Sequence, residues 1–267
     1  MSRWSDLVAV LTGRGGAPGA GGDGPEGRAG YGRTTGYPTS SNRASSMHLF
    51  WELPPGGAPI VAASARLLVE ATPPVDELYF WALQGSFTDG GGHKHGGAHL
   101  GLQWHASHPG SRAANWGGYA PGGGILPGSE SALPSATGNA NTRDLWWEAG
   151  EPHRLTIERS AGGGWAGSVD GARLRTLAAG GDRLDGLMVW SEVFARCDAP
   201  PVAVRWSGLT ATDADGVVRS PVAVRVNYQR RADGGCDNTT AEPDGDGVRQ
   251  LTATPRRVAQ GARLPLG

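Results

Sequence analysis

Five of the seven histidines fall in one glycine-rich stretch, GGGHKHGGAHLGLQWHASHPG, at residues 90–110. Neutral imidazole is a ligand for zinc, copper, nickel and iron, and an H-x-H pair projects both rings to one side of a strand. His93, His95 and His99 are therefore candidate metal ligands. The alternative is a glycine-rich loop whose histidines share no role, because short motifs of this kind often occur by chance.

The strand that follows this loop limits how the histidines can combine. If residues 98–105 form a strand, His99 and His105 face the same way but lie about 20 Å apart, too far to share one ion. A metal site would therefore combine His99 with His93 and His95. This spacing is similar to the first metal motif of the cupins, although His99 replaces their glutamate. The similarity implies, as one alternative, a metal-dependent cupin-like or polysaccharide-acting enzyme.

Polar side chains also interrupt the apolar runs. Gln84 ends YFWALQ, Glu192 alternates with Trp190 in LMVWSEVF, and Arg225 alternates with valines in VAVRVNY. Amide and charged groups bind hydroxyls, and an aromatic ring stacks on the apolar side of a sugar. We expect a carbohydrate or a similar polyhydroxy ligand on a concave sheet face. The predicted contacts are Gln84, Gln103, Trp116, Trp190, Glu192, Arg225 and Asn227.

No catalytic motif decides between binding and catalysis. Glu192 is equally suited to a cross-strand ion pair with Arg205 or Arg225 that holds a sheet together. The chain has no Gly-x-Ser-x-Gly nucleophile elbow. Its strand glutamates Glu70, Glu158 and Glu192 come from different runs, so no carboxylate pair for glycoside hydrolysis can be identified. The sequence leaves open whether the protein is an enzyme, and it predicts no cofactor beyond the transition metal of the alternative.

The elements that would position these residues are strands. From residue 47 onward, short runs rich in aliphatic and aromatic residues are separated by Gly, Pro, Asp and Asn, a pattern typical of strands and turns. Asp170 and Gly171 are a favoured pair for a two-residue hairpin turn. About ten such strands predict an all-β, antiparallel β-sandwich of jelly-roll, concanavalin-like type. Segment 59–71, PIVAASARLLVEA, also permits a helix.

Composition divides the chain into three parts. Residues 1–46 are rich in Gly, Ser and Pro and poor in aliphatic residues, so we expect a flexible, disordered arm. Residues 47–235 carry the predicted strands of one β-sandwich domain. Residues 236–267 are polar and interrupted by prolines, which predicts a C-terminal tail that lies along the surface or is disordered.

Two motifs carry a family resemblance. YFWALQGSF is followed by GGAHLGLQW, and a hairpin lies in HRLTIERSAGGGWAGSVDG. Over residues 48–230 the chain resembles a bacterial family of domains of unknown function, and more loosely the lectin and glucanase type of β-sandwich. The resemblance implies a concave sandwich that meets carbohydrate. It transfers no catalytic residue, because the Glu-x-Asp-x-x-Glu strand of many such glucanases is absent.

Charge and cysteine content limit the classes of binding partner and the cellular compartment that we expect. A net charge of -1 and the lack of a basic run argue against nucleic acid, and no apolar stretch is long enough to span a membrane. Cys197 and Cys236 lack metal or redox spacing but permit one disulfide, which would favour an oxidising compartment. No signal peptide is recognisable, so the expectation is a cytoplasmic protein, or a secreted one if the start is assigned wrongly.

Overall fold

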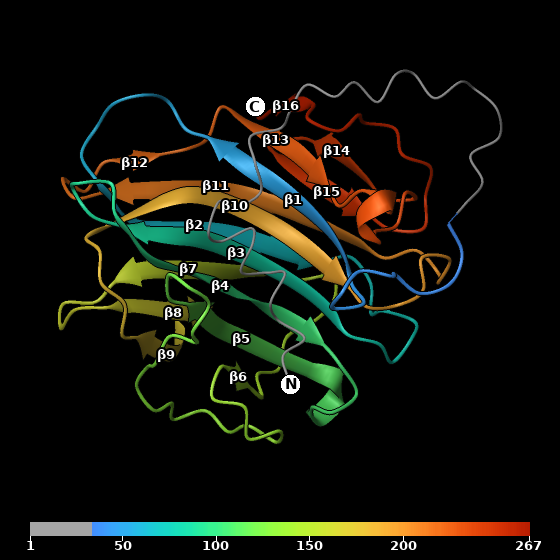
Figure 1. Cartoon of the computed structure of the whole chain (residues 1–267), viewed down its shortest axis with the longest axis horizontal. Coiled ribbons are helices and arrows are strands. Elements are labelled where there is room, and N and C mark those ends of the chain that lie inside the picture. Colours follow the sequence, from blue (N-terminus) through green and yellow to red (C-terminus); the bar gives the residue numbers. More distant parts are fainter. Residues whose placement is uncertain (1–33) are drawn as a thin grey trace.

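Two antiparallel sheets pack face to face in this protein, which confirms the predicted β-sandwich (Figure 1). The structure, a computed structural model, describes residues 34–267. The first sheet has the order β16-β13-β1-β10-β3-β4-β5-β6, and the second has the order β14-β15-β11-β2-β7-β8-β9, with β12 paired to β11. No helix in this range is long and apolar enough to cross a membrane.

The strands of the first sheet are β1 (Ser45–Glu52), β3 (Tyr79–Thr88), β4 (Lys94–Trp104), β5 (Arg112–Tyr119), β6 (Thr142–Arg143), β10 (Arg183–Val193), β13 (Ala223–Tyr228) and β16 (Arg263–Pro265). The strands of the second sheet are β2 (Ile60–Val69), β7 (Pro152–Arg159), β8 (Trp165–Val169), β9 (Ala172–Leu177), β11 (Ala203–Asp213), β12 (Val218–Arg219), β14 (Thr240–Asp244) and β15 (Gly247–Leu251). Two short 3-10 turns, η1 (Pro109–Ser111) and η2 (Arg231–Asp233), complete the regular structure of the described residues.

The core lies between the two sheets and follows the alternation of the strands. Leu83, Leu100 and Val189 of the first sheet and Leu67 and Trp206 of the second are each fully or almost fully buried in it. Because successive side chains of a strand point to opposite faces, the residues between these core positions lie on the outer face of the first sheet. That outer face carries the candidate site.

Two local expectations can be compared with the structure. The Asp170-Gly171 hairpin forms with positive φ at both residues, as a two-residue turn of this pair requires. Segment 59–71 is strand β2 rather than a helix, because it is paired on both sides, with β11 and β7. Pairing across a sheet thus overrides the helix propensity of its alanines and leucines.

The C-terminal segment 236–267 contributes three strands, β14, β15 and β16, instead of a tail that only lies on the surface. Its polar residues are compatible with burial because they are hydrogen-bonded. Gln250 is 2 % exposed, and its side chain accepts hydrogen bonds from Trp206 Nε1 and Ser191 Oγ and donates to the Met47 carbonyl. Burying an amide whose donors and acceptors are all hydrogen-bonded costs little free energy. The polar composition of the segment therefore does not reveal that it forms strands of the core.

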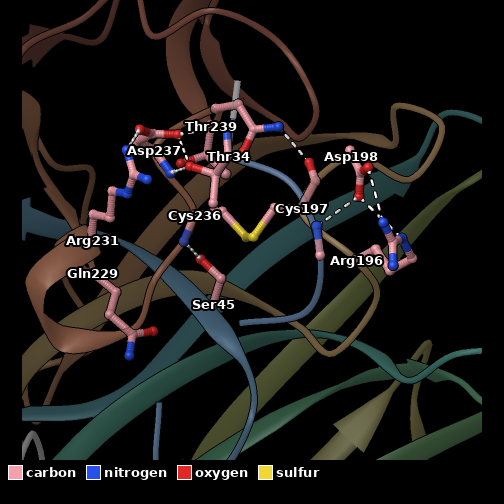
Figure 2. The surroundings of a disulfide bond; sticks show 12 residues. Thr34, Ser45, Arg196, Cys197, Asp198, Gln229, Arg231, Cys236, Asp237 and Thr239 are labelled. Atoms are coloured by element: carbon pink, nitrogen blue, oxygen red, sulfur yellow. Dashed lines mark hydrogen bonds and ion pairs between the residues drawn. A yellow bond between two sulfur atoms is a disulfide. The ribbon is translucent and has the colours of Figure 1, made fainter. Parts of the chain in front are cut away.

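Residues 1–33 of the predicted N-terminal arm 1–46 lie outside the described residues. The remainder, residues 34–44, packs against the domain beside a disulfide between Cys197 and Cys236, whose formation the sequence left open (Figure 2). The Cys197 amide donates to the Gly36 carbonyl, and the Cys236 amide donates to Ser45 Oγ where β1 begins. The disulfide therefore joins the end of β10 to the chain before β14 at the place where segment 34–44 is held.

Candidate functional site

The candidate site is a set of polar and aromatic side chains on the outer face of the first sheet, in its four central strands. Glu192 of β10 pairs with Phe80 of β3, and Phe80 pairs with Gln103 of β4. Glu192 and Gln103 therefore lie in one row across the sheet, separated by roughly 10 Å of backbone. The next row along holds Trp190, and the row after that holds Gln84.

Glu192 is the most perturbed acid of this face. Its side chain is 1 % exposed, and burial raises the pKa of the carboxyl to about 7 although hydrogen bonds from Asn42 and Ser46 lower it. Both of these bonds reach Oε1, whereas Oε2 is buried and has no hydrogen-bond partner among the described residues. A carboxyl with a pKa near neutrality and one uncommitted oxygen suits general acid-base chemistry.

Asn42 orients this carboxyl. Its amide nitrogen lies 2.8 Å from Glu192 Oε1, so the amide donates to that oxygen. Asn42 Oδ1 in turn accepts from Ser40 Oγ at 2.9 Å and from the Ala44 amide at 3.2 Å. Because the acceptor side of Asn42 is occupied by two donors, its amide group cannot flip without losing both bonds. The segment before β1 thus presents a fixed donor to Glu192.

Gln103 is the second polar group of the row, and its side-chain amide is uncommitted. The residue is 5 % exposed, and the described residues offer no hydrogen bond to its Oε1 or Nε2. Its backbone is fixed, since Phe80 pairs with it on one side and Ala113 on the other. Its carbonyl also accepts from Trp147 Nε1 at 3.3 Å. A free amide on a rigid strand is a preorganised donor.

Aromatic rings form the floor beside this row. Trp190 packs edge-on against Phe80, with 5.0 Å between ring centroids, and His99 packs edge-on against Phe80 at 5.4 Å. Trp190 Nε1 donates to Gln84 Oε1 at 2.8 Å. Gln84 is consequently held by Trp190, and the acceptor oxygen of its amide is already engaged.

Two histidines of this face are buried in the neutral state. Burial lowers the pKa of His48 and of His99 to about 4. Nδ1 of each ring is buried without a hydrogen-bond partner among the described residues. Tyr119 lies beside His99, and burial, followed by the charge of Glu192, raises the pKa of its hydroxyl to about 12. A pKa of about 4 is too low for efficient general base catalysis near pH 7. Glu192, with a pKa of about 7, is the better suited base of this face.

The remaining predicted ligand contacts lie elsewhere. Trp116 lies on the inner side of β5, fully buried in the core, and its Nε1 donates to the Trp165 carbonyl. Arg225 and Asn227 share the outer face but belong to β13, which is two strands away from β10, the strand of Glu192. Arg225 is exposed and ion-paired with Glu52, and Asn227 accepts from Gln260. The structure brings together only Gln84, Gln103, Trp190 and Glu192 of the predicted set.

The predicted ion pairs of Glu192 with Arg205 or Arg225 do not form, because each partner is engaged elsewhere. Arg205 binds Asp244 and Asp246 of the second sheet. Arg225 binds Glu52, a carboxylate on the outer face that also binds Arg263. Glu192 therefore has no cationic partner among the described residues.

The candidate metal ligands do not converge. His93 Nδ1 and His95 Nε2 both contact the carboxylate of Asp89, at 3.1 and 2.9 Å, and the hydrogen bond from His95 is the main reason that the pKa of Asp89 is lowered. His99 instead lies among Phe80 and the other rings of the outer face. Residues 34–267 contain no group of three or more histidine, cysteine, aspartate or glutamate side chains arranged to hold a metal ion.

Sequence reasoning missed two residues of the site. Asn42 falls in a segment whose Gly, Ser and Pro content predicts an arm, and nothing in its local pattern distinguishes it. His48 lies between the core residues Met47 and Leu49 in an apolar strand, and its place opposite Trp190 becomes visible only once the pairing of β1 with β10 is known. A polar residue inside an apolar run was the signal that found Gln84 and Glu192, and it applies to His48 as well.

No protein-family model matches the chain, and no curated protein matches it. Among solved structures, a Scytalido-glutamic peptidase with a peptide-based transition state analogue is 11 % identical, covers 81 % of this chain and 98 % of that chain, and has a TM-score of 0.45. SCP-B, a member of the Eqolisin family of peptidases in complex with Ala-Ile-His, is 10 % identical at the same coverages, with a TM-score of 0.43.

An alginate lyase from Pseudomonas aeruginosa is 16 % identical over 64 % of this chain and 66 % of that chain, with a TM-score of 0.24. The similar structures thus carry the names of a peptidase, a lyase and, in a further case, a glycosidic hydrolase. Likeness at this distance carries no inference about chemistry. The role of the outer face therefore rests on its own geometry.

Proposed function

We propose that the protein is a hydrolase that cleaves an acyl bond, such as the amide of a peptide, on the outer face of the first sheet. The observation that carries the proposal is the row Glu192, Phe80, Gln103. It places a carboxyl with a pKa of about 7 and a free oxygen in line with an uncommitted amide. Hydrolysis of a carbonyl compound needs these two functions, a base for water and a donor for the oxyanion.

The roles follow from the chemistry of each group. The Glu192 carboxylate accepts a proton from a water molecule as the water oxygen bonds to the carbonyl carbon. The carbonyl oxygen gains the electron pair of its π bond, and the Gln103 N–H groups donate to that oxyanion. When the oxyanion collapses, the carbon–nitrogen bond breaks and Glu192 returns the proton to the leaving nitrogen. Asn42 is a positioning residue, since it holds Oε1 and leaves Oε2 for the water.

The distribution of acids favours this reaction over a two-carboxylate glycosidase. Two other carboxylates lie on this face of the sheet: Asp185 is seven residues before Glu192 on β10, and Glu52 of β1 is six residues from Ser46, the residue that pairs with Glu192. Each is roughly 20 Å from Glu192, whereas a glycosidase pair is separated by about 5 to 10 Å. Glu52 is in addition neutralised by Arg225 and Arg263.

A casein-cleavage assay tests the proposal. The wild-type protein is expected to release peptides, and Glu192→Gln is expected to lower the rate at least a hundredfold, because general acid-base catalysis contributes about 10² to 10⁴. Gln103→Ala should lower the rate about 10² to 10³. Glu158→Gln, which changes an exposed glutamate of β7, is the matched control and should retain the rate. Equal rates in Glu192→Gln and wild type would refute the assignment.

Binding of a carbohydrate or another polyhydroxy ligand on the same face is a second candidate. It is favoured by one observation, the amides of Gln84 and Gln103 beside the rings of Trp190 and Phe80. A glycan array separates the two functions. Saturable glycan binding that is lost in Gln103→Ala, together with no casein cleavage, would support this candidate and remove the hydrolase.

A further inference from the structure

Two exposed arginines lie side by side on the outer face of the second sheet, on the opposite side of the sandwich from Glu192. Arg66 of β2 pairs directly with Arg154 of β7, so their Cβ atoms are roughly 5 Å apart. Their strand neighbours Leu67 and Leu155 are core residues, so both arginine side chains point away from the core. Both side chains are exposed to solvent.

Within residues 34–267 neither Arg66 nor Arg154 forms an ion pair, because the acids of this face have other partners. These partners are Arg249 for Glu70, Arg173 for Glu158 and His153 for Asp170. Asp170 also accepts from the backbone amide of Arg154 rather than from its guanidinium group. Like charges directly opposite each other destabilise a pair of strands. The two cations therefore lack a counter-charge on this part of the sheet.

The two guanidinium groups lie over neighbouring positions of the sheet. Arg154 Nη1 is 3.2 Å from Ser64 Oγ, so the Arg154 side chain crosses from β7 onto β2. The Arg66 side chain lies over β11, since a Cβ built on Gly208 would be 3.6 Å from its Nη1. Gly208 belongs to the bulge of β11 that faces the stretch of β2 between Arg66 and Ser64. Both charged groups therefore face the same exposed area above β2 and β11.

A row of hydroxyl groups adjoins the arginines and crosses four strands that lie side by side (Figure 1). Thr210 of β11 pairs with Ser64 of β2, Ser64 pairs with Thr156 of β7, and Thr156 pairs with Ser168 of β8. The four side chains are half-buried, and each has a core residue next to it along its strand, so all four lie on the outer face. Neighbouring strands are about 4.8 Å apart, so the row spans roughly 14 Å. It offers hydroxyl donors and acceptors at regular intervals beside two cations.

From this arrangement we infer that Arg66, Arg154 and the hydroxyl row form a binding surface for an acidic polysaccharide. Arginine binds the oxygens of a charged group through parallel N–H bonds, and serine and threonine hydroxyls both donate to and accept from sugar hydroxyls. A sugar chain with sulfate or carboxylate groups is complementary to this face in charge and in hydrogen bonding. The surface lies on the other sheet from Glu192 and Gln103, so its failure would leave the proposed hydrolase unaffected.

Three polymers with one backbone test the inference by calorimetric titration of the wild-type protein: dextran sulfate, carboxymethyl dextran and uncharged dextran. Saturable binding is expected for at least one charged dextran, at least about tenfold tighter than for dextran. The tighter of the two identifies the charged group as sulfate or carboxylate. Polyphosphate, which is charged but is not a sugar, should bind at least about tenfold more weakly than that polymer. No saturable binding of either charged dextran, or equal binding of polyphosphate, would overturn the inference.

Substitutions on the two sheets localise the binding. Arg66→Gln and Arg154→Gln should each weaken the affinity for the charged dextran at least about tenfold. Arg225→Gln is the matched control, since it removes an exposed arginine from the outer face of the first sheet, and its affinity should equal that of wild type. Thr156→Val keeps both charges and removes one hydroxyl of the row, so it should weaken the binding of the charged dextran and leave that of polyphosphate unchanged. Wild-type affinity in either arginine variant would contradict the site, and wild-type affinity in Thr156→Val would contradict the role of the hydroxyl row.

Discussion

Glu192 and Gln103 flank the same residue, Phe80, from the two strands on either side of it. An acid and an amide are thereby held on one row of a sheet by backbone pairing alone. Because the rows of a sheet are rigid, the separation of the two groups does not depend on a mobile loop. In the proposed reaction, Glu192 as the base and Gln103 as the oxyanion donor would lie on either side of a substrate acyl bond bound over Phe80.

Burial raises the pKa of Glu192, and the hydrogen bond from Asn42 opposes that rise. Asn42→Ala removes the donor to Oε1, and the pKa of the carboxyl is expected to rise above about 7 by about one to two units, since a hydrogen bond to a charged group is worth about 1.5 to 3 kcal/mol. A ¹³C NMR titration of the Glu192 Cδ signal measures this shift without any substrate. Asn227→Ala, on the same face but remote from Glu192, is the control. An unchanged midpoint in Asn42→Ala would show that Asn42 does not act on the carboxyl.

Burial of Glu192 makes the stability of the protein fall between acidic and neutral pH. The folded pKa of about 7 lies above the unfolded value of 4.5, so the unfolded state loses the proton first and stability falls as pH rises from 4.5 through 7. The loss amounts to about 3 kcal/mol at 1.36 kcal/mol per unit. Glu192→Gln cannot ionise and should lack this fall. Urea unfolding at pH 5 and pH 8 measures it, and a fall of equal size in the variant would refute the burial of a titrating acid.

The buried histidines act in the opposite direction. Because the folded pKa of His99 is about 4 and the unfolded value is 6.5, its contribution to stability is present above pH 6.5 and is lost as pH falls toward 4. His99→Gln removes the titration, so its free energy of unfolding should depend less on pH between 6.5 and 4, by about 3 kcal/mol. His93→Gln, whose imidazole is largely exposed, serves as control. If both variants kept the wild-type pH dependence, His99 would not be buried in the neutral form.

The Cys197–Cys236 disulfide supports the segment that carries Asn42. The bridge closes a loop with a sequence separation of 39, and its removal by Cys197→Ser with Cys236→Ser should cost about 3 to 4 kcal/mol of stability. Amide hydrogen exchange should accelerate at residues 34–44, because Gly36 and Ser45 bond to the two cysteines directly. Exchange that rises only near Cys197 would show that the segment is held by other contacts.

Strand alternation was sufficient to predict part of the site. Gln84, Gln103 and Glu192 are polar residues within apolar strands, and alternation places each opposite to core residues on its own strand. The relative order of the strands is not contained in that pattern. Hence the row that joins Glu192 to Gln103, through Phe80, appears only when β10, β3 and β4 pair.

Other features were beyond a local pattern for physical reasons. Trp116 lies in the core because the phase of β5 turns it toward Trp165, and a run such as AANWGGY does not reveal which face is the inner one. Gln250 is buried through hydrogen bonds to distant residues, so a polar composition conceals a core strand. Asn42 acts from a segment whose composition resembles a linker. Each depends on contacts between segments far apart in the sequence.

The pH dependence of casein cleavage tests the central claim most directly. If Glu192 is the general base, kcat/KM of the wild type should rise through an apparent pKa near 7 and level off above it, as the carboxyl of the free enzyme ionises. Glu192→Gln should be at least a hundredfold slower, and the step near pH 7 should be absent. A profile with the same midpoint and height in wild type and Glu192→Gln would contradict the assignment of Glu192 as the catalytic acid and base.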